Sequence, residues 1–154
     1  MTHARFAIAA IAFVSSGLLR SQPIIVSQQM KVLRGKVESC IGDFGQWVAK
    51  LSVPYERKTG MKLYPGTLNI RLANPYTIAA GSIRLEAHEF GGTVGVSIVP
   101  CRVLWRRAFI LCTDANNEGT GRHPRTVVEI ASDVKLRNDY NLADGDEISV
   151  EVEG

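Results

Sequence analysis

Thr67 and Asn69 are the residues whose types and spacing point most directly to chemistry. They stand two positions apart in an expected strand, 67–72, so both side chains lie on one face of it. A hydroxyl oxygen and an amide oxygen are hard ligands that could share one Mg²⁺ ion and leave its other positions to phosphates and water. The alternative is that both side chains only hydrogen-bond the backbone of the turn at Pro65 and Gly66.

Glu129 is the next candidate, because it is an acid inside the apolar run 127–131. An unpaired buried charge is costly, so this carboxylate must face either solvent or a ligand. The preceding segment, 113–125, is polar and rich in Gly and Asn, and a loop of this length is often functional. His123 lies in it and could orient a phosphate, although an isolated loop histidine is more often merely exposed.

Short strands separated by turn residues must position these groups. Strand-like runs cover 32–38, 67–72, 82–89, 93–99, 102–105, 108–111, 126–131 and 147–153, and 46–51 also alternates apolar and polar residues. Phe90-Gly91-Gly92 is a hairpin signal, and short helices are expected at 54–60 and 133–140. The pattern predicts a mostly β fold, a closed barrel or a sandwich.

Composition narrows the class of protein. A chain of 154 residues has room for one domain with a real core, and 45% hydrophobic with 21% charged residues is ordinary for a soluble globular protein. The net charge of +3 suits an anionic small molecule and is too small for the basic stripe of a nucleic-acid binder.

The three cysteines, Cys40, Cys101 and Cys112, lack the spacing of a zinc site, and their odd number favours a reducing compartment. If 94–113 is a hairpin turning at 105–107, Cys101 and Cys112 lie opposite one another. We interpret them as two free thiols packed as small apolar groups.

Several segments, in order, resemble the CTP-dependent riboflavin kinase family. Tyr64-Pro-Gly-Thr-Leu-Asn-Ile70 is close to that family's PYPGTLN signature. Gly35-Lys-Val37 with Ser39 and Gly42 is similar to its GxVxSGxGxG opening, and 95–100 to its central strand. The tail is also similar, with Val128-Glu-Ile-Ala131, Lys135-Leu-Arg137 and Leu142-Ala-Asp-Gly-Asp146. The likeness spans nearly all of 30–154 and implies a six-stranded cradle-loop barrel that transfers a phosphoryl group from CTP to riboflavin, giving FMN.

The resemblance also implies roles for particular residues. Thr67 and Asn69 would hold Mg²⁺, while Thr120 and Glu129 would contact the flavin. CTP would be bound by two segments: Ser39, Cys40, Ile41, Gly42, Asp43, Phe44 and Gly45, and Lys135, Leu136, Arg137 and Asn138.

The chain departs from the family pattern at several of these positions. Cys40 and Phe44 stand where the family has glycine, Gly45 could serve only if the loop is shifted by one residue, and Asn138 replaces an acid. A Cβ at a glycine position blocks positive φ or crowds a phosphate. Thr120 is a loose match, because its loop is longer than in the family. The alternative to a kinase is therefore a non-catalytic flavin- or nucleotide-binding module on the same barrel.

Residues 1–29 stand outside the fold argument. Arg5, an apolar run at 6–14 and the small residues Ser15-Ser16-Gly17 form a weak signal peptide, too short for a confident membrane span. The alternative is an upstream extension, since the first strand follows directly after Met30. We favour the extension and a cytoplasmic domain over 30–154 without a membrane segment, because an exported kinase would find no nucleoside triphosphate. An exported interaction protein is the third hypothesis, and it draws on residues 1–29 alone.

Overall fold

The computed structural model describes residues 29–39 and 42–153. Residues 1–28, Cys40 and Ile41 lie outside the described residues, so what the sequence predicts for them remains a prediction. None of the helices in the described part is long and apolar enough to cross a membrane.

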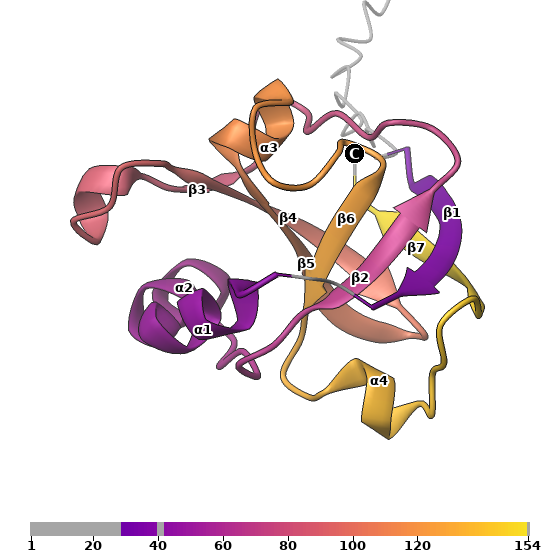
Figure 1. The fold of residues 1–154 in the computed structure, drawn as a ribbon. Helices are drawn as coiled ribbons and strands as arrows, with labels where there is room; N and C mark the ends of the chain where they lie inside the picture. Colours follow the sequence, from indigo (N-terminus) through magenta and orange to yellow (C-terminus); the bar gives the residue numbers. More distant parts are fainter. Residues whose placement is uncertain (1–28, 40–41, 154) are drawn as a thin grey trace, which may run out of the picture.

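Seven strands and four short α-helices make up the described chain (Figure 1). The strands are β1 Lys31–Glu38, β2 Leu68–Leu72, β3 Ile83–Leu85, β4 Val96–Val103, β5 Arg106–Thr113, β6 Val127–Ala131 and β7 Glu147–Val152. The helices are α1 Phe44–Lys50, α2 Ser52–Thr59, α3 Asp114–Glu118 and α4 Leu136–Asp139, with a 3-10 turn at Ala87–Glu89.

Six of the strands close into an antiparallel barrel, as the sequence predicted. The sheet runs β3-β4-β5-β6-β2-β1-β7, and β4 also pairs with β7, which closes the ring and leaves β3 as an additional strand. Closure removes the free edges that an open sheet of this kind would expose. Figure 1 shows α3 and α4 near opposite ends of the barrel and α1 with α2 beside its wall.

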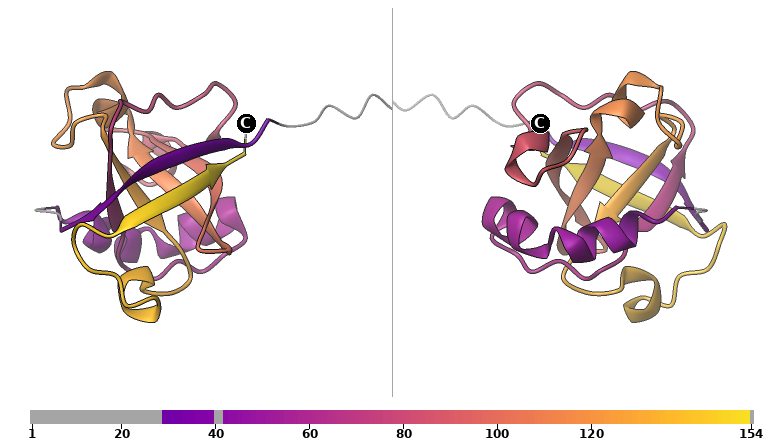
Figure 2. Two further views of the ribbon diagram at one scale, coloured as in Figure 1. Left: turned by 90° about the vertical axis from the view of Figure 1, so that its right-hand side faces the viewer. Right: turned by 60° about the vertical axis from the view of Figure 1, so that its left-hand side comes forward.

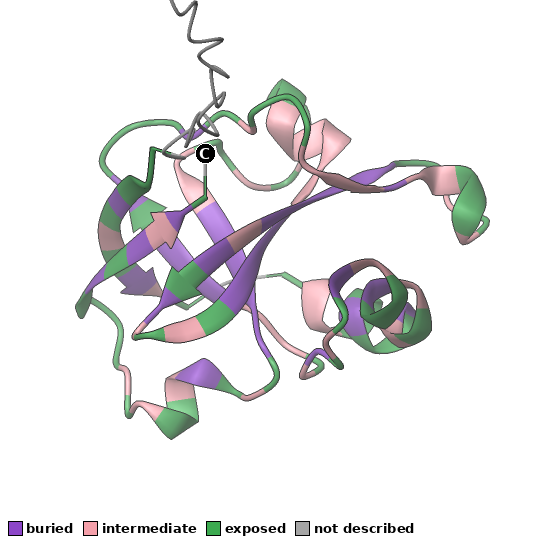
Figure 3. Ribbon diagram, turned by 180° about the vertical axis from the view of Figure 1, so that it is seen from behind, coloured by how far each residue is buried: buried purple, intermediate pink, exposed green. Residues whose placement is uncertain are grey.

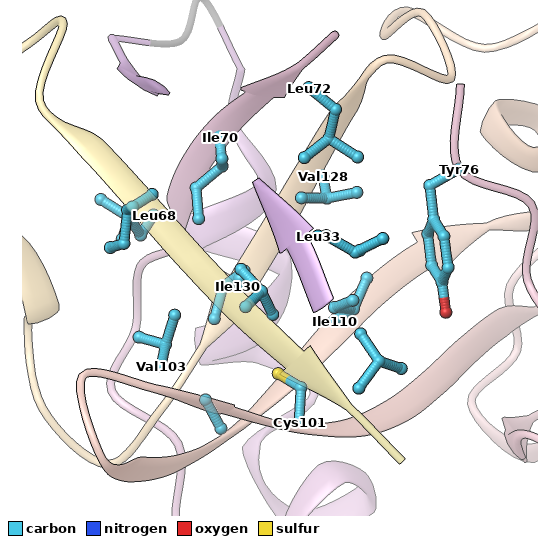
Figure 4. Close-up of a cluster of buried hydrophobic side chains, with 14 of the residues drawn as sticks. Leu33, Leu68, Ile70, Leu72, Tyr76, Cys101, Val103, Ile110, Val128 and Ile130 are labelled. Atoms are coloured by element: carbon cyan, nitrogen blue, oxygen red, sulfur yellow. The ribbon is translucent and has the colours of Figure 1, made fainter. Parts of the chain in front are cut away.

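The barrel interior is filled by alternate residues of the six barrel strands (Figure 4). On β2, Leu68, Ile70 and Leu72 point inward and belong to this core. Val128 and Ile130 do the same on β6. Because successive side chains of a strand point to opposite faces, the residues between them face the outer wall.

A second apolar core lies on that outer wall, where α1 and α2 pack against the strands (Figure 2). Val48, Leu51 and Tyr55 face Phe109 and Leu111 of β5 in it. Their spacing of three and four residues is helical, so the apparent alternation at 46–51 was a wrong indication of a strand. The helix expected at 54–60 begins earlier, at Ser52, directly after α1.

The hairpin of β3 and β4 stretches away from the barrel beside α2, and its tip consists of exposed and partly buried residues (Figures 1 and 3). The pairing of 82–89 with 93–99 is confirmed only in part, since β3 ends at Leu85. Arg84 fixes its base through Ser97 Oγ at 2.9 Å and Asp114 Oδ1 at 2.6 Å. At the tip, Lys58 Nζ lies 2.8 Å from Glu89 Oε1 and joins the hairpin to α2.

Two cysteines lie in the next hairpin, and their expected opposition was wrong. Cys101 pairs with Ala108 and Cys112 with Ser97, because the chain turns at Leu104 and Trp105 rather than at 105–107. Both cysteines are free thiols. Burial raises the pKa of Cys101 to about 12, so this thiol behaves as a core residue.

The remaining differences from the expected elements are small. The polar loop 113–125 begins with α3, whose first turn is capped by Thr113 Oγ1 accepting from the Asn116 N–H at 3.1 Å. The helix expected at 133–140 is confined to α4.

Gly35 is a position where the barrel tolerates no side chain. A Cβ placed there would overlap the Arg71 carbonyl oxygen on β2 and lie 2.7 Å from Ile70 Cγ2. Since the first obstacle is backbone, relief requires movement of paired strands. We expect Gly35→Ala to lower the free energy of unfolding by about 2 kcal/mol or more in urea denaturation. Arg34→Ala on the same strand is the control, and an equal effect of the two changes would contradict the crowding argument.

Candidate active site

A row of polar side chains crosses three neighbouring strands on the outer wall. Pairing places Asn69 of β2 between Glu38 of β1 and Glu129 of β6. Asn69 and Glu129 are buried, with 6% and 3% exposure, whereas Glu38 is half-buried and ion-paired with Arg71. The row lies on the barrel's outer face, because the residues on either side of Asn69 and Glu129 belong to the inner core.

Thr67 joins this row at Glu129. Its Oγ1 donates to Glu129 Oε1 at 3.4 Å, and His123 Nε2 lies 4.0 Å from the same oxygen. Within the described chain, Glu129 Oε2 and Asn69 Oδ1 are buried and accept no hydrogen bond from protein. An unsatisfied buried acceptor costs roughly 1–3 kcal/mol, and such groups in a folded protein commonly mark a place where a ligand or ion binds.

Glu129 is held in an environment that disfavours its charge. Burial raises the pKa of Glu129 to about 7, helped by the nearby Asp43 carboxylate and opposed by the hydrogen bond from Thr67. A carboxyl group that titrates near neutral pH can accept or release a proton under physiological conditions.

An aromatic cavity of about 420 Å³ opens beside this row, between α1, α2, the β3–β4 hairpin and the loop after α3. This volume lies within the range of roughly 300–1,000 Å³ typical of small-molecule pockets. Four aromatic side chains line it: Phe44, Trp47, Tyr55 and Phe90. Gly42, Asp43, Arg122 and His123 contribute a polar side. The Tyr55 hydroxyl is buried in it, and burial together with the charge of Glu129 raises the pKa of Tyr55 above its ordinary value.

A smaller cavity of about 180 Å³, the α4 cavity, lies between α4 and the turn that precedes β2. Thr67, Lys135 and Arg137 are among its lining residues. Leu136 anchors α4 in the barrel core, which leaves the two cations on either side of it pointing outward. Arg137 Nη1 lies 2.8 Å from Asp144 Oδ1, and hydrogen bonds from Ser39 and Arg137 hold the pKa of Asp144 below its ordinary value.

Glu129 therefore lies between two cavities. Its hydrogen-bond partner Thr67 lines the α4 cavity, and its neighbour His123 lines the aromatic cavity. A group bound on one side and a group bound on the other would meet at this carboxylate. That arrangement suits transfer of a group between two ligands.

The segment 42–45 approaches the same place. Phe44 begins α1 and packs partly against the outer core, so its backbone is helical and needs no glycine. A Cβ on Gly45 would lie 3.3 Å from both Pro65 O and Gly66 Cα, so the small residue lets α1 pack closely on the turn before Thr67.

Several predicted site residues line neither cavity, among them Gly45, Asn69, Glu129, Thr120 and Asn138. Thr120 is exposed and its Oγ1 donates to the Ala115 carbonyl at 3.2 Å, which closes the end of α3. Asn138 is exposed on α4. The roles of Thr120 and Asn138 remain predictions.

Sequence reasoning missed Trp47, Tyr55, Phe90 and Arg122 as parts of the site. The available signal was the aromatic residue in Phe90-Gly91-Gly92, since a large apolar side chain in a glycine turn has no local reason to be there. The exposure of Trp47, 46% at the cavity, is visible only in the structure.

A larger and shallower hollow of about 700 Å³ lies over β1 and β7. Its lining includes neither Thr67 nor His123, the two residues whose side chains lie at Glu129 Oε1. Its charged residues are balanced, with the cations Arg34, Lys36 and Arg71 and the acids Glu38, Asp144 and Glu147. We therefore place the candidate site at the two cavities beside Glu129.

Residues 41–152 match a family model named for the CTP-dependent riboflavin kinase, described as "Domain of unknown function DUF120". The match covers most of the chain, including both walls of the site. The chain belongs to the CTP-dependent riboflavin kinase family. The resemblance carried by the PGTLN segment and the tail is thereby confirmed.

Curated relatives in this family carry the name riboflavin kinase. The chain is 33% identical over 131 residues to that of Methanocella arvoryzae, covering 79% of this chain and 57% of the relative. The riboflavin kinase of Methanopyrus kandleri is 30% identical, and the match covers 68% of this chain and 73% of that relative. The riboflavin kinase of Methanosphaera stadtmanae is 29% identical, and the match covers 80% of this chain and 99% of that relative. The chain spans little more than half the length of the first of these relatives.

Proposed function

We propose that this chain transfers the terminal phosphoryl group of CTP to the ribityl 5′-hydroxyl of riboflavin, giving FMN. The observation that carries the proposal is the buried Glu129 carboxylate between the aromatic cavity and the α4 cavity. Family membership and the relatives named riboflavin kinase support the same reaction. A donor on one side and an acceptor on the other would bring the reacting atoms together at this residue.

The aromatic cavity suits the flavin. Riboflavin carries a flat, largely apolar ring system, and aromatic side chains bind such rings by stacking. Trp47 and Phe90 line the cavity, and His123 brings its polar side within 4.0 Å of Glu129. The ribityl chain would then run from the ring toward Glu129, whose Oε2 is available to accept the hydrogen bond of the 5′-hydroxyl.

The α4 cavity suits the nucleotide and has the start of the segment 39–45 beside it, whereas Gly42, Asp43 and Phe44 of that segment line the aromatic cavity. Lys135 and Arg137 supply cations beside Thr67, as a triphosphate requires. The hydrogen bonds to Asp144 tie Arg137 to Ser39 and hold α4 close to the start of that segment. The helical Phe44 removes the steric objection at one of the two positions where the family has glycine.

Thr67 Oγ1 and Asn69 Oδ1 fit a magnesium ion, because both are hard oxygen donors and the amide oxygen is buried without a protein partner in the described chain. No three His, Cys, Asp or Glu side chains cluster as metal ligands in the described residues. When bound, Mg²⁺ supplies charge neutralisation to the phosphates. Glu129 would orient the acceptor hydroxyl and hold its proton at Oε2.

The decisive experiment incubates the purified chain with riboflavin, CTP and Mg²⁺ and separates FMN by chromatography. We expect FMN to form with CTP, and its formation to stop when Mg²⁺ is chelated. Replacing CTP with ATP tests the nucleotide preference. Riboflavin binding in calorimetry without FMN formation from any nucleoside triphosphate would overturn the kinase proposal and favour the non-catalytic binding module.

Trp47 gives a prediction for the flavin side alone. Removing a stacking ring costs about 1 kcal/mol, so we expect Trp47→Ala to weaken riboflavin binding about 5-fold to 10-fold while the affinity for CTP is unchanged. Quenching of riboflavin fluorescence measures the effect. Trp105→Ala is the matched control, because Trp105 is 89% exposed at the β4–β5 turn. Equal binding by the two variants would place the flavin elsewhere.

A further inference from the structure

We infer that Arg122 is a catalytic residue, whose guanidinium contacts the phosphoryl group during its transfer. The inference rests on the proposed function and deepens it. Arg122 lies on the loop that joins α3 to β6 (Figure 1), and its side chain is 79% exposed. Among the described residues that line the aromatic cavity, it is the only Arg or Lys.

Arg122 lies beside Asp43 in the aromatic cavity. Arg122 Nη1 lies 3.7 Å from Asp43 Oδ1. The charge of Asp43 contributes to the raised pKa of Glu129, so the two carboxylates are near one another. Arg122 thus lies on the acceptor side, close to the carboxylate where the two ligands would meet.

The ion pair with Asp43 is weak enough to be exchanged. At 3.7 Å it is longer than a hydrogen bond, and both side chains are more than half exposed. Exposed pairs of this kind contribute little to stability. A guanidinium binds phosphate oxygens through two parallel hydrogen bonds, which are stronger. Arg122 can therefore leave Asp43 for a phosphate at little cost.

The chemistry leaves a role for this cation. In phosphoryl transfer, negative charge is spread over the equatorial oxygens of the group in flight, and a positioned arginine stabilises it. Lys135 and Arg137 stand on the α4 side, and Arg137 is already paired with Asp144. The acceptor side has Arg122 and, depending on its protonation, His123. Arg122 would complete the neutralisation from the side opposite α4.

The test compares Arg122→Ala with Arg125→Ala, which removes the same charge from an exposed arginine on the same loop. In steady-state assays of FMN formation, we expect Arg122→Ala to lower kcat on the order of 1,000-fold while KM for riboflavin changes much less. Arg125→Ala should stay within about 2-fold of the unmodified chain. Added guanidinium ion should restore part of the kcat of Arg122→Ala and leave that of Arg125→Ala unchanged, an outcome that a merely structural role would not produce.

The contrary results are equally distinct. An active unmodified chain with the same kcat in both variants would overturn this inference alone, and so would a loss confined to KM. A chain that forms no FMN at all would overturn the proposed function and this inference together. Because Arg122 is exposed, both variants should keep the melting temperature of the unmodified chain, so a lost activity can be assigned to chemistry.

Discussion

Asn69→Ala should abolish nearly all kinase activity while the fold survives. The change removes an amide oxygen that is buried without a protein partner in the described chain, so it deletes a proposed metal ligand and relieves an unsatisfied acceptor at once. We expect kcat/KM to fall on the order of 100-fold or more, because loss of one preorganised electrostatic contact commonly has that effect. Titration of activity with Mg²⁺ should show a higher requirement in the variant.

Asn74→Ala is the control for this change, because Asn74 is exposed just beyond the end of β2. It should retain full activity. Thr67→Ala should behave like Asn69→Ala in the magnesium titration, since both oxygens are proposed ligands of one ion. If Asn69→Ala kept its activity and its magnesium requirement, the metal would have to bind elsewhere.

Glu129→Gln should make the ligand-free protein more stable above neutral pH. The pKa of Glu129 is raised from 4.5 to about 7 in the folded chain, so the folded state holds a proton that the unfolded state has lost between these values. Stability is therefore complete below about pH 4.5, falls as the pH rises toward 7, and is lower by about 3 kcal/mol above that. The amide of Gln carries no charge to bury and avoids the loss.

Urea denaturation of both proteins at pH 5 and pH 8 measures the difference. At pH 8 the variant should unfold at a higher urea concentration, while at pH 5 the gap should shrink. Glu147→Gln, at an exposed carboxylate of β7, should change the free energy of unfolding by less than about 0.5 kcal/mol. Parallel pH profiles for the unmodified chain and Glu129→Gln would show that burial of this carboxylate costs little.

The predicted strands and the PGTLN segment led from sequence to the barrel and to the candidate metal residues. A period of two specifies the face on which Thr67 and Asn69 lie, and an acid in an apolar run signals a special carboxylate at Glu129. Both signals depend only on neighbouring residues, so they can be recognised in the sequence alone. The closure of β4 on β7 came from family resemblance, because pairing between distant strands leaves little trace in one sequence.

The parts that escaped prediction depend on tertiary contacts. The segment 46–51 alternates, but its burial against β5 follows the helical spacing of Val48, Leu51 and Tyr55. The closeness of Asp43 and Arg122 arises because α1 and the loop after α3 meet over β6, and nothing in their local sequence indicates it.

The closing contact of β4 with β7 has a consequence for how this protein matures. The groups around Glu129 come from several strands and loops, and the ring holds them in register. Chains dominated by such long-range pairings fold slowly. A chain in which β7 has not yet paired with β4 would therefore lack the assembled candidate site, and any activity would appear only after the ring has closed.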